Sequence, residues 1–221
     1  MNENQIQKLY KLRYPESLTR KKKKIWEIII YNFHQKFISE NETVMEIAVG
    51  HGEFINTISS AKKIAVDINP DCENYLKKNI EFVCCDANNI PKKFFNKIDT
   101  LYVSNFLEHL NNKNELEKFF SIVKKLLKRD GKFMILGPNL RYLPGKYWDY
   151  YDHYLGLTHF SLIEALQLSG FDITYVKDKF LPHLDRDATK ISHPFFVYLY
   201  LKFPIFWKVL GKQFFIIAKK I

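Results

Sequence analysis

Residues 44–54 read Val-Met-Glu-Ile-Ala-Val-Gly-His-Gly-Glu-Phe, and this stretch decides the fold. An apolar run carries one acidic residue, Glu46, and then passes through Gly50 and Gly52. This is the pattern of a buried strand that turns at glycines into a helix, and glycine lets a backbone approach a ligand where a Cβ would collide. The first amides of such a helix have no partner within the helix. We therefore expect a strand at residues 44–49 and a ligand-binding turn directly after it.

From residue 43 onward, short apolar runs alternate with amphipathic segments, which is typical of a parallel sheet covered by helices on both faces. The expected strands are residues 44–49, 63–67, 80–85, 100–104, 132–136, 173–180 and 214–218. Apolar residues at intervals of three and four predict helices at 113–128 and from about Ser161 to Gly170. The last two strands have no crossover helix of their own and should pair antiparallel at the sheet edge. The sequence predicts an α/β, three-layer fold with a seven-stranded, mostly parallel sheet and an antiparallel edge strand.

The composition describes one folded domain with appendages. The chain has 221 residues, 47% of them hydrophobic and 26% charged, which excludes a disordered chain. We expect residues 1–42 to form an N-terminal helical cap and residues 43–221 the main domain. Within the main domain, residues 137–160 form a long loop after the fifth strand, and residues 182–211 form a helical insertion before the last one.

Charge and cysteine content restrict the setting. A net charge of +10 attracts anionic partners such as phosphorylated metabolites, nucleic acid or acidic lipid, without choosing among them. The three cysteines lack CxxC spacing, which fits a reducing compartment. Residues 2–4 are Asn-Glu-Asn, and no long apolar segment follows them, so we expect no secretory signal and a cytoplasmic location.

Two further acids stand where strands end. Asp67 ends the second expected strand and Asp86 follows the third. The carboxyl ends of parallel strands meet at one rim, where open α/β folds bind ligands, and an acid at such a position can accept hydrogen bonds from ribose hydroxyls. The alternative is that each acid caps a neighbouring helix. A nicotinamide dinucleotide is disfavoured because Ile55 occupies the place of the third glycine in that fingerprint.

Four segments together resemble the class I S-adenosylmethionine-dependent methyltransferases, and they give the expected sheet the Rossmann-like methyltransferase fold. They are Glu46-Ile-Ala-Val-Gly-His-Gly, Ala65-Val-Asp-Ile-Asn-Pro, Cys85-Asp-Ala and Ser104-Asn-Phe-Leu-Glu-His-Leu. Two later segments, Gly137-Pro-Asn-Leu-Arg-Tyr and Tyr147-Trp-Asp-Tyr-Tyr-Asp-His, are similar to a bacterial subgroup associated with surface-polysaccharide biosynthesis. The resemblance covers nearly the full chain.

The resemblance implies S-adenosylmethionine as the cofactor and assigns residues to it. Glu46, Gly50 and Gly52 would frame its methionine and ribose part, and Asp67 would hold the ribose diol with Ile68 beside it. Asp86 would bind the adenine amino group, Ala87 would donate a backbone amide nearby, and Asn105 would lie near the sulfonium. Ala48 departs from the family pattern, because it occupies the place of the usual first glycine.

The loop at residues 137–160 is the expected acceptor-binding loop. Its aromatic and basic side chains could pack on a ring and grip an anion, and the candidate acceptor contacts are Arg141, Tyr142, Tyr147, Trp148 and Asp152. His153 beside Asp152 is our first choice for a general base, and His109 is the second. For any one of these residues, structural packing is the competing explanation.

We expect no metal site. Two sets of side chains could supply ligands, namely Asp149, Asp152, His153 and His159, or His183, Asp185, Asp187 and His193. Neither set has a recognised ligand spacing.

The apolar segment 194–210 is interrupted by Lys202, Pro204 and Lys208 and is too broken to span a bilayer. It could pack as a helical cover or homodimer surface, or lie in the headgroup region on the inner face of the membrane.

The sequence favours methylation of a small anionic acceptor, such as a sugar, a nucleotide-activated sugar or a polysaccharide precursor. O-methylation is preferred because a histidine base is at hand. Two alternatives stay open. One is an RNA methyltransferase, suggested by the charge, although the scattered basic residues do not favour a nucleic-acid partner. The other is a non-catalytic binding module on the same fold.

Overall fold

A seven-stranded mixed sheet organises the chain. The computed structural model describes residues 16–182 and 193–221. The strands are β1 (Thr43–Ile47), β2 (Lys62–Asp67), β3 (Glu81–Cys84), β4 (Ile98–Ser104), β5 (Leu127–Pro138), β6 (Phe171–Lys177) and β7 (Gln213–Lys220). Their spatial order is β3-β2-β1-β4-β5-β7-β6, and β1 to β5 are paired in parallel. β7 pairs antiparallel with β5 on one side and with β6 on the other. The predicted α/β, three-layer fold with a seven-stranded, mostly parallel sheet is confirmed.

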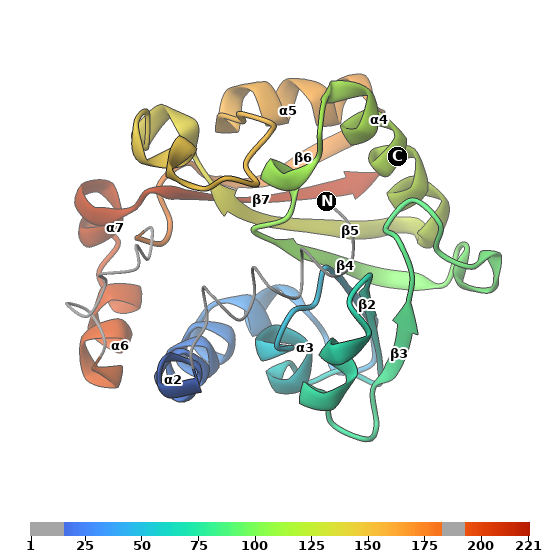
Figure 1. Cartoon of the computed structure of the whole chain (residues 1–221), viewed down its shortest axis with the longest axis horizontal. Coiled ribbons are helices and arrows are strands. Elements are labelled where there is room, and N and C mark those ends of the chain that lie inside the picture. Colours follow the sequence, from blue (N-terminus) through green and yellow to red (C-terminus); the bar gives the residue numbers. More distant parts are fainter. Residues whose placement is uncertain (1–15, 183–192) are drawn as a thin grey trace.

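Helices cover both faces of this sheet (Figure 1). α4 (Lys113–Leu126) and α5 (His159–Leu168) lie on one face, and α2 (Glu16–Asn32) and α3 (Glu53–Thr57) lie on the other. Each face has its own buried apolar cluster, so the sheet is the middle of three layers. Short 3₁₀ helices fill the connections: η1 (His34–Phe37), η2 (Pro70–Tyr75), η3 (Lys92–Phe94), η4 (Leu107–His109), η5 (Leu140–Tyr142) and η6 (Lys146–Asp149).

α4 follows from its sequence pattern. Five apolar side chains on one side of the helix are buried: Leu116, Phe119, Phe120, Val123 and Leu126. The Asn112 side chain caps the start by accepting from the Glu115 amide. The helix ends at Leu126, earlier than the predicted Lys128, because Leu127 already pairs with Ile98 in the sheet. Gly131, which we would expect from its sequence to follow the helix end as a turn, lies inside β5.

α5 also has the expected ends. Thr158 and Ser161 form a reciprocal capping box at its start. Gly170, with φ +76°, follows its end, a conformation that glycine adopts without a Cβ penalty. The chain then enters β6 at the sheet edge.

The predicted cap and insertion both contain helices where the structure describes them. In the predicted cap at residues 1–42, α2 and η1 are helical. In the predicted insertion at 182–211, α6 (Pro194–Lys202) and α7 (Ile205–Leu210) are helical, and α6 contacts α2. Residues 183–192 of that insertion lie outside the described residues. The division of the chain into cap, domain and insertion stays a prediction.

The strand order places a binding rim. From β1 the chain continues outward to β2 and β3, and then returns to β4 on the other side of β1. Crossovers that leave in opposite directions make a crevice at the carboxyl ends of β1 and β4, where open α/β sheets bind ligands. The glycine turn after β1 and the loops after β4 and β5 begin at this rim.

Candidate active site

The turn after β1 has an unusual backbone. Ala48, Gly50 and Gly52 all have positive φ, at 58°, 53° and 69°. The φ of Gly52 would strain any other residue, and a Cβ there would also displace Leu76 Cδ2 and Asn56 Nδ2, at 2.6 and 2.8 Å. The predicted glycine turn is therefore present as a tight bend between β1 and α3.

Two buried carboxylates hold this bend in place. Glu46 Oε2 accepts the Ile55 amide of α3 at 3.0 Å, and Asp67 Oδ2 accepts the Gly50 amide at 3.0 Å. The sequence suggested that the first amides of α3 are open to a ligand. Glu46 accepts a hydrogen bond from one of them, so not all of them are open. The acid inside β1 fixes the helix that follows the turn.

The backbone of Ala48 is strained in this turn, because its φ is positive. A residue with a Cβ in the left-handed region costs about 1–2 kcal/mol relative to the right-handed one. Glycine would remove this strain but would also gain about 0.4–1 kcal/mol of unfolded-state entropy. Ala48 replaces the family's usual glycine but still has a backbone conformation that favours glycine.

We expect Ala48→Gly to stabilise the protein by about 0.5–1 kcal/mol, measured as the free energy of unfolding in urea. Ala61→Gly is the control, because Ala61 lies in an exposed turn without positive φ. That control should lose stability. A loss of stability in Ala48→Gly would contradict a strained backbone at residue 48.

Asp67 lies at the centre of the rim. It is buried, and its Oδ1 accepts the Asn69 amide at 2.9 Å while Oδ2 holds Gly50. A carboxylate has about four acceptor sites, so the protein amides leave acceptor capacity for ribose hydroxyls. The Cys72 thiol is nearby, and burial, followed by the Asp67 charge, raises its pKa. This thiol is therefore kept neutral beside the carboxylate.

The other predicted cofactor residues lie at the neighbouring strand ends and are more open. Ile68 and Asp86 are exposed, and Ala87 is half-buried. Asp86 Oδ1 accepts the Asn88 amide at 2.8 Å, which forms a local turn and does not cap a helix. Asn105 is exposed after β4, with φ +49° and its amide bonded to the Leu136 carbonyl at 2.9 Å. The residues assigned to adenine, ribose and sulfonium thus follow the ends of β3, β2 and β4, in that order across the sheet.

A second group of polar side chains stands beside this rim. Glu108 and His109 belong to η4 after β4, and Asp152 and His153 belong to the loop after β5. His109 Nδ1 lies 2.8 Å from the Asp152 carbonyl oxygen and 3.2 Å from Asp152 Oδ2. The rings of His109 and His153 are 5.2 Å apart. The two histidines predicted as base candidates are therefore neighbours in one cluster.

Glu108 gives this cluster an unusual electrostatic character. It is buried, and a Cβ built on Gly137 would lie 3.8 Å from its Oε2. Burial raises the pKa of the Glu108 carboxyl to about 7, with the Asp152 charge adding to the rise and His109 opposing it. Sequence analysis did not assign a role to Glu108. Its position in the Leu-Glu-His run was the available signal.

The predicted acceptor contacts divide into supporting and open residues. Tyr147 is fully buried and bonds to the Leu155 carbonyl, so its ring supports the loop from inside. Trp148 is 50% exposed, and Tyr150 stacks on His153 at 4.8 Å. Tyr150 was not among the predicted contacts, and its stacking on His153 could not be predicted from the sequence.

Arg141 and Tyr142 follow the end of β5. Arg141 is exposed, with its guanidinium 5.2 Å from the centre of the Phe160 ring. The Tyr142 hydroxyl donates to Asp178 Oδ2 at 2.6 Å. Arg141 is thus the open cation of the loop, whereas Tyr142 is tied to the end of β6.

Of the first set of metal ligands considered from the sequence, His159 has a different partner: its Nδ1 lies 3.0 Å from Asn139 Nδ2. Of the second set, His183, Asp185 and Asp187 lie outside the described residues. Among the residues that the structure describes, Glu108, His109 and His153 place ligand atoms within 4.8 Å of one another.

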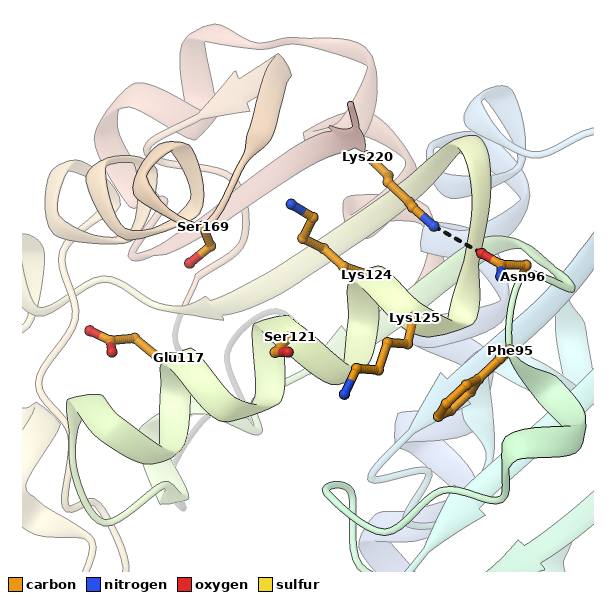
Figure 2. A pocket seen from close by; sticks show the side chains of 8 residues that line it. All are labelled: Phe95, Asn96, Glu117, Ser121, Lys124, Lys125, Ser169 and Lys220. Carbon is orange, nitrogen blue, oxygen red and sulfur yellow. Dashed lines mark hydrogen bonds between the residues drawn. The ribbon is translucent and has the colours of Figure 1, made fainter.

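A cleft of about 530 Å³ lies elsewhere on the surface. Figure 2 shows Lys124, Lys125 and Lys220 around it, with Lys220 bonded to Asn96 Oδ1 at 3.0 Å. Asn96 precedes β4 and Lys220 ends the antiparallel β7. This cleft is therefore at the amino ends of the parallel strands, opposite the glycine turn, and is separate from the candidate site.

Comparison with known proteins agrees with this geometry. Residues 45–135 match the family model described as Methyltransferase domain. No curated protein gives a significant match. The matched segment runs from β1 to β5 and contains the glycine turn, Asp67, Asp86 and the η4 residues.

Solved methyltransferases have the same fold. A SAM dependent methyltransferase from Archaeoglobus fulgidus is 22% identical with a TM-score of 0.63, over 96% of this chain and 97% of that one. An S-adenosylmethionine dependent methyltransferase from Mesorhizobium loti is 14% identical with a TM-score of 0.61, over 86% and 97%. The geranyl diphosphate C-methyltransferase from Streptomyces coelicolor, solved with Mg²⁺, geranyl diphosphate and S-adenosyl-L-homocysteine, is 11% identical with a TM-score of 0.61, over 89% and 78%. At these identities the likeness is one of fold.

The described residues have the fold of the class I methyltransferases, and residues 45–135 match the methyltransferase-domain model. The solved proteins that share this fold include S-adenosylmethionine-dependent methyltransferases.

Proposed function

We propose that this enzyme transfers the methyl group of S-adenosylmethionine to a hydroxyl of a small anionic sugar, a nucleotide-activated sugar or a polysaccharide precursor. The observation that carries the proposal is the meeting of Glu108, His109 and His153 in the loops that follow β4 and β5, at the same strand ends as the glycine turn and Asp67. A site that holds a methyl donor and an acceptor needs both groups at one rim. The polysaccharide context rests on the resemblance of residues 137–153.

The proposed cofactor site uses the residues around the bend. Gly50 and Gly52 admit the methionine and ribose part, Glu46 holds α3, and Asp67 accepts the ribose hydroxyls with Ile68 beside it. Asp86 and Ala87 take the adenine, and Asn105 stands near the sulfonium. In-line attack on the methyl carbon needs the acceptor oxygen opposite the sulfur, so the protein's main work is alignment.

The proposed acceptor site is the loop after β5 together with η4. Trp148 offers an exposed ring for a sugar or base, and Arg141 offers an exposed guanidinium for a phosphate or carboxylate. His153, His109 and Glu108 act on the nucleophilic hydroxyl. An anionic acceptor is also favoured by the net charge of +10. The similar fold from Streptomyces coelicolor, solved with geranyl diphosphate, is a further reason to test phosphorylated acceptors.

The test of the cofactor site is calorimetric titration with S-adenosylhomocysteine. Asp67→Asn should weaken binding about 10- to 100-fold, because it removes a charged acceptor of the ribose hydroxyls. Asparagine keeps one oxygen for the Gly50 or Asn69 amide. The melting temperature of each variant, measured without ligand, separates a loss of fold from a loss of binding.

Asp71→Asn is the matched control for this titration. It makes the same change of charge four residues along the chain, on the exposed side of η2, and should bind as the unsubstituted protein does. Equal binding by Asp67→Asn and Asp71→Asn would remove Asp67 from the cofactor site. No binding by the unsubstituted protein would overturn the proposed function.

A second surface suits the proposed substrate class. α6 and α7 bury Val197, Tyr200 and Trp207 but leave a set of apolar side chains exposed: Phe195, Phe196, Tyr198, Phe203, Ile205, Phe206, Val209 and Leu210. Lys202, Lys208 and Lys212 lie on the same segment. No helix among the described residues is long and apolar enough to cross a membrane. We propose that this surface lies on anionic lipid at the cytoplasmic face, where Cys72, Cys84 and Cys85, which form no disulfide, are stable as thiols.

Vesicle sedimentation tests the lipid surface. The protein should sediment with phosphatidylglycerol vesicles and much less with phosphatidylcholine vesicles, because the lysines attract anionic headgroups. Phe196→Ser combined with Phe206→Ser should strongly reduce sedimentation with phosphatidylglycerol vesicles, because the apolar contact with the bilayer is lost. Leu168→Ser, which changes an 84% exposed side chain on α5, should not. Sedimentation with neither lipid, or self-association through this surface, would overturn the membrane assignment.

A further inference from the structure

The cluster of Glu108, His109 and His153 has the composition of a metal-binding site. One carboxylate and two imidazoles supply an oxygen and two nitrogens, a donor set that suits divalent first-row metals. Their ligand atoms all lie within 4.8 Å of one another. Closing onto one ion with bonds of about 2.0–2.2 Å requires shifts smaller than a carbon–carbon bond.

The hydrogen bonds of His109 prepare it for this role. Its Nδ1 lies 2.8 Å from the carbonyl oxygen of Asp152, which can only accept, so Nδ1 carries the proton. The lone pair of the neutral ring is then on Nε2. Asp152 Oδ2, 3.2 Å from Nδ1, completes the carboxylate–histidine pairing that commonly supports metal ligands.

The remaining two ligands are also held in place. Glu108 is 3% exposed, and a buried carboxylate is costly unless a cation or hydrogen bonds compensate it. The His153 ring lies between Tyr150, stacked at 4.8 Å, and Tyr147, edge-on at 5.0 Å. Tyr147 is itself fully buried, so the ring stands on a rigid support.

We propose that Glu108, His109 and His153 bind one divalent cation that receives the hydroxyl oxygen of the methyl acceptor. Three protein ligands leave positions open for that oxygen, as in catalytic zinc sites. Asp152 is a positioning residue that acts through His109. This inference rests on the proposed function and replaces the sequence-based expectation of no metal site.

The cation gives the acceptor a route to attack at neutral pH. A hydroxyl bound to a divalent ion has a lowered pKa, so its O–H bond breaks and the proton passes to bulk water. The resulting alkoxide oxygen forms a bond to the methyl carbon. The carbon–sulfur bond breaks with its electron pair going to sulfur, which yields the methyl ether and neutral S-adenosylhomocysteine.

Cation binding is measured on the EDTA-stripped and desalted full chain, without acceptor. Mn²⁺ is titrated and its free fraction followed by electron paramagnetic resonance, and Zn²⁺ is tested by competition. We expect one site per chain. Glu108→Gln and His153→Gln should each weaken Mn²⁺ binding by more than about 100-fold, and Asp152→Asn by about 10- to 100-fold.

Asp149→Asn is the control, because Asp149 is an exposed acid of the same loop and is not among the three ligands. It should bind Mn²⁺ as the unsubstituted chain does. Melting temperatures without metal show whether each variant folds, and Glu108→Gln should fold because it is isosteric and removes a buried charge. No site for either ion, or equal binding by Glu108→Gln, His153→Gln and Asp149→Asn, would overturn the cation site.

The titration with S-adenosylhomocysteine in EDTA separates this inference from the proposed function. Cofactor binding without any cation site would leave the methyltransferase proposal intact and return His153 and His109 to direct roles as bases. Cation binding without cofactor binding would instead count against the proposed function alone.

Discussion

His153→Gln is expected to lower kcat about 100-fold or more while leaving the dissociation constant of S-adenosylmethionine unchanged. His153 stands with Glu108 and His109 in the proposed acceptor site, whereas Gly50 and Asp67 bond to one another in the proposed cofactor site. Glutamine is of similar size but is neither a base at neutral pH nor a good metal ligand. The loss should therefore fall on the chemical step.

The measurement is the rate of S-adenosylhomocysteine formation with a nucleotide-activated sugar on which the unsubstituted protein turns over. Tyr151→Phe is the matched control, because Tyr151 belongs to the same loop and is 83% exposed. It should keep kcat within a small factor. If His153→Gln lost cofactor affinity as much as turnover, His153 would be a structural support and not part of the acceptor site.

Acid should destabilise this protein through one buried histidine, His34. The ring is fully buried in η1 and lies against Phe54, Tyr102 and Phe215, with ring centres 5.2–5.8 Å away. Burial lowers the pKa of His34 from 6.5 to about 3. The folded protein therefore holds this ring neutral at pH values where the unfolded chain takes up a proton.

The direction of the effect follows from the lowered pKa. The stabilising difference is fully present above pH 6.5 and is lost as the pH falls from 6.5 toward 3. One proton contributes about 1.4 kcal/mol per pH unit, so the loss of unfolding free energy is on the order of 5 kcal/mol. Because whole domains are stable by only about 5–15 kcal/mol, this one group should remove a large part of the stability by pH 3.

Urea unfolding at a series of pH values measures this dependence. His34→Phe keeps an aromatic ring in the cluster and should reduce the slope of unfolding free energy against pH by about one proton between pH 6 and 4. His193→Asn is the control: it removes an exposed imidazole and keeps a side chain able to cap α6. An unchanged slope in His34→Phe would show that other groups govern acid unfolding.

Patterns along the chain were sufficient to predict the sheet. Strands and helices have different side-chain periods. The apolar runs of β1 and β4 therefore predict strands, and the spaced apolar residues of α4 predict a helix. The exact ends of the helices were harder to predict from the sequence. α4 stops at Leu126 because Leu127 pairs with Ile98, a contact between residues far apart in sequence.

The candidate cofactor site could largely be read from local chemistry. Glycines at a strand-to-helix turn and acids at strand ends are tied to positions in the chain, and parallel strands bring those positions to one rim. The residues Glu46, Gly50, Gly52 and Asp67 were predicted in this way. The hydrogen bonds that these residues make were not predicted. Glu46 accepts the Ile55 amide, and Asp67 accepts the Gly50 amide.

The sequence by itself determined the layered fold, the glycine turn and the two acids at its rim, because side-chain period and backbone sterics act over a few residues. Only the tertiary structure decided that Glu108 and His109 meet Asp152 and His153, with His109 and Asp152 43 residues apart. It also decided that Tyr147 lies buried while Trp148 beside it stays open. The physical reason is that such meetings depend on how distant segments pack against the same sheet edge, and no local propensity encodes that packing.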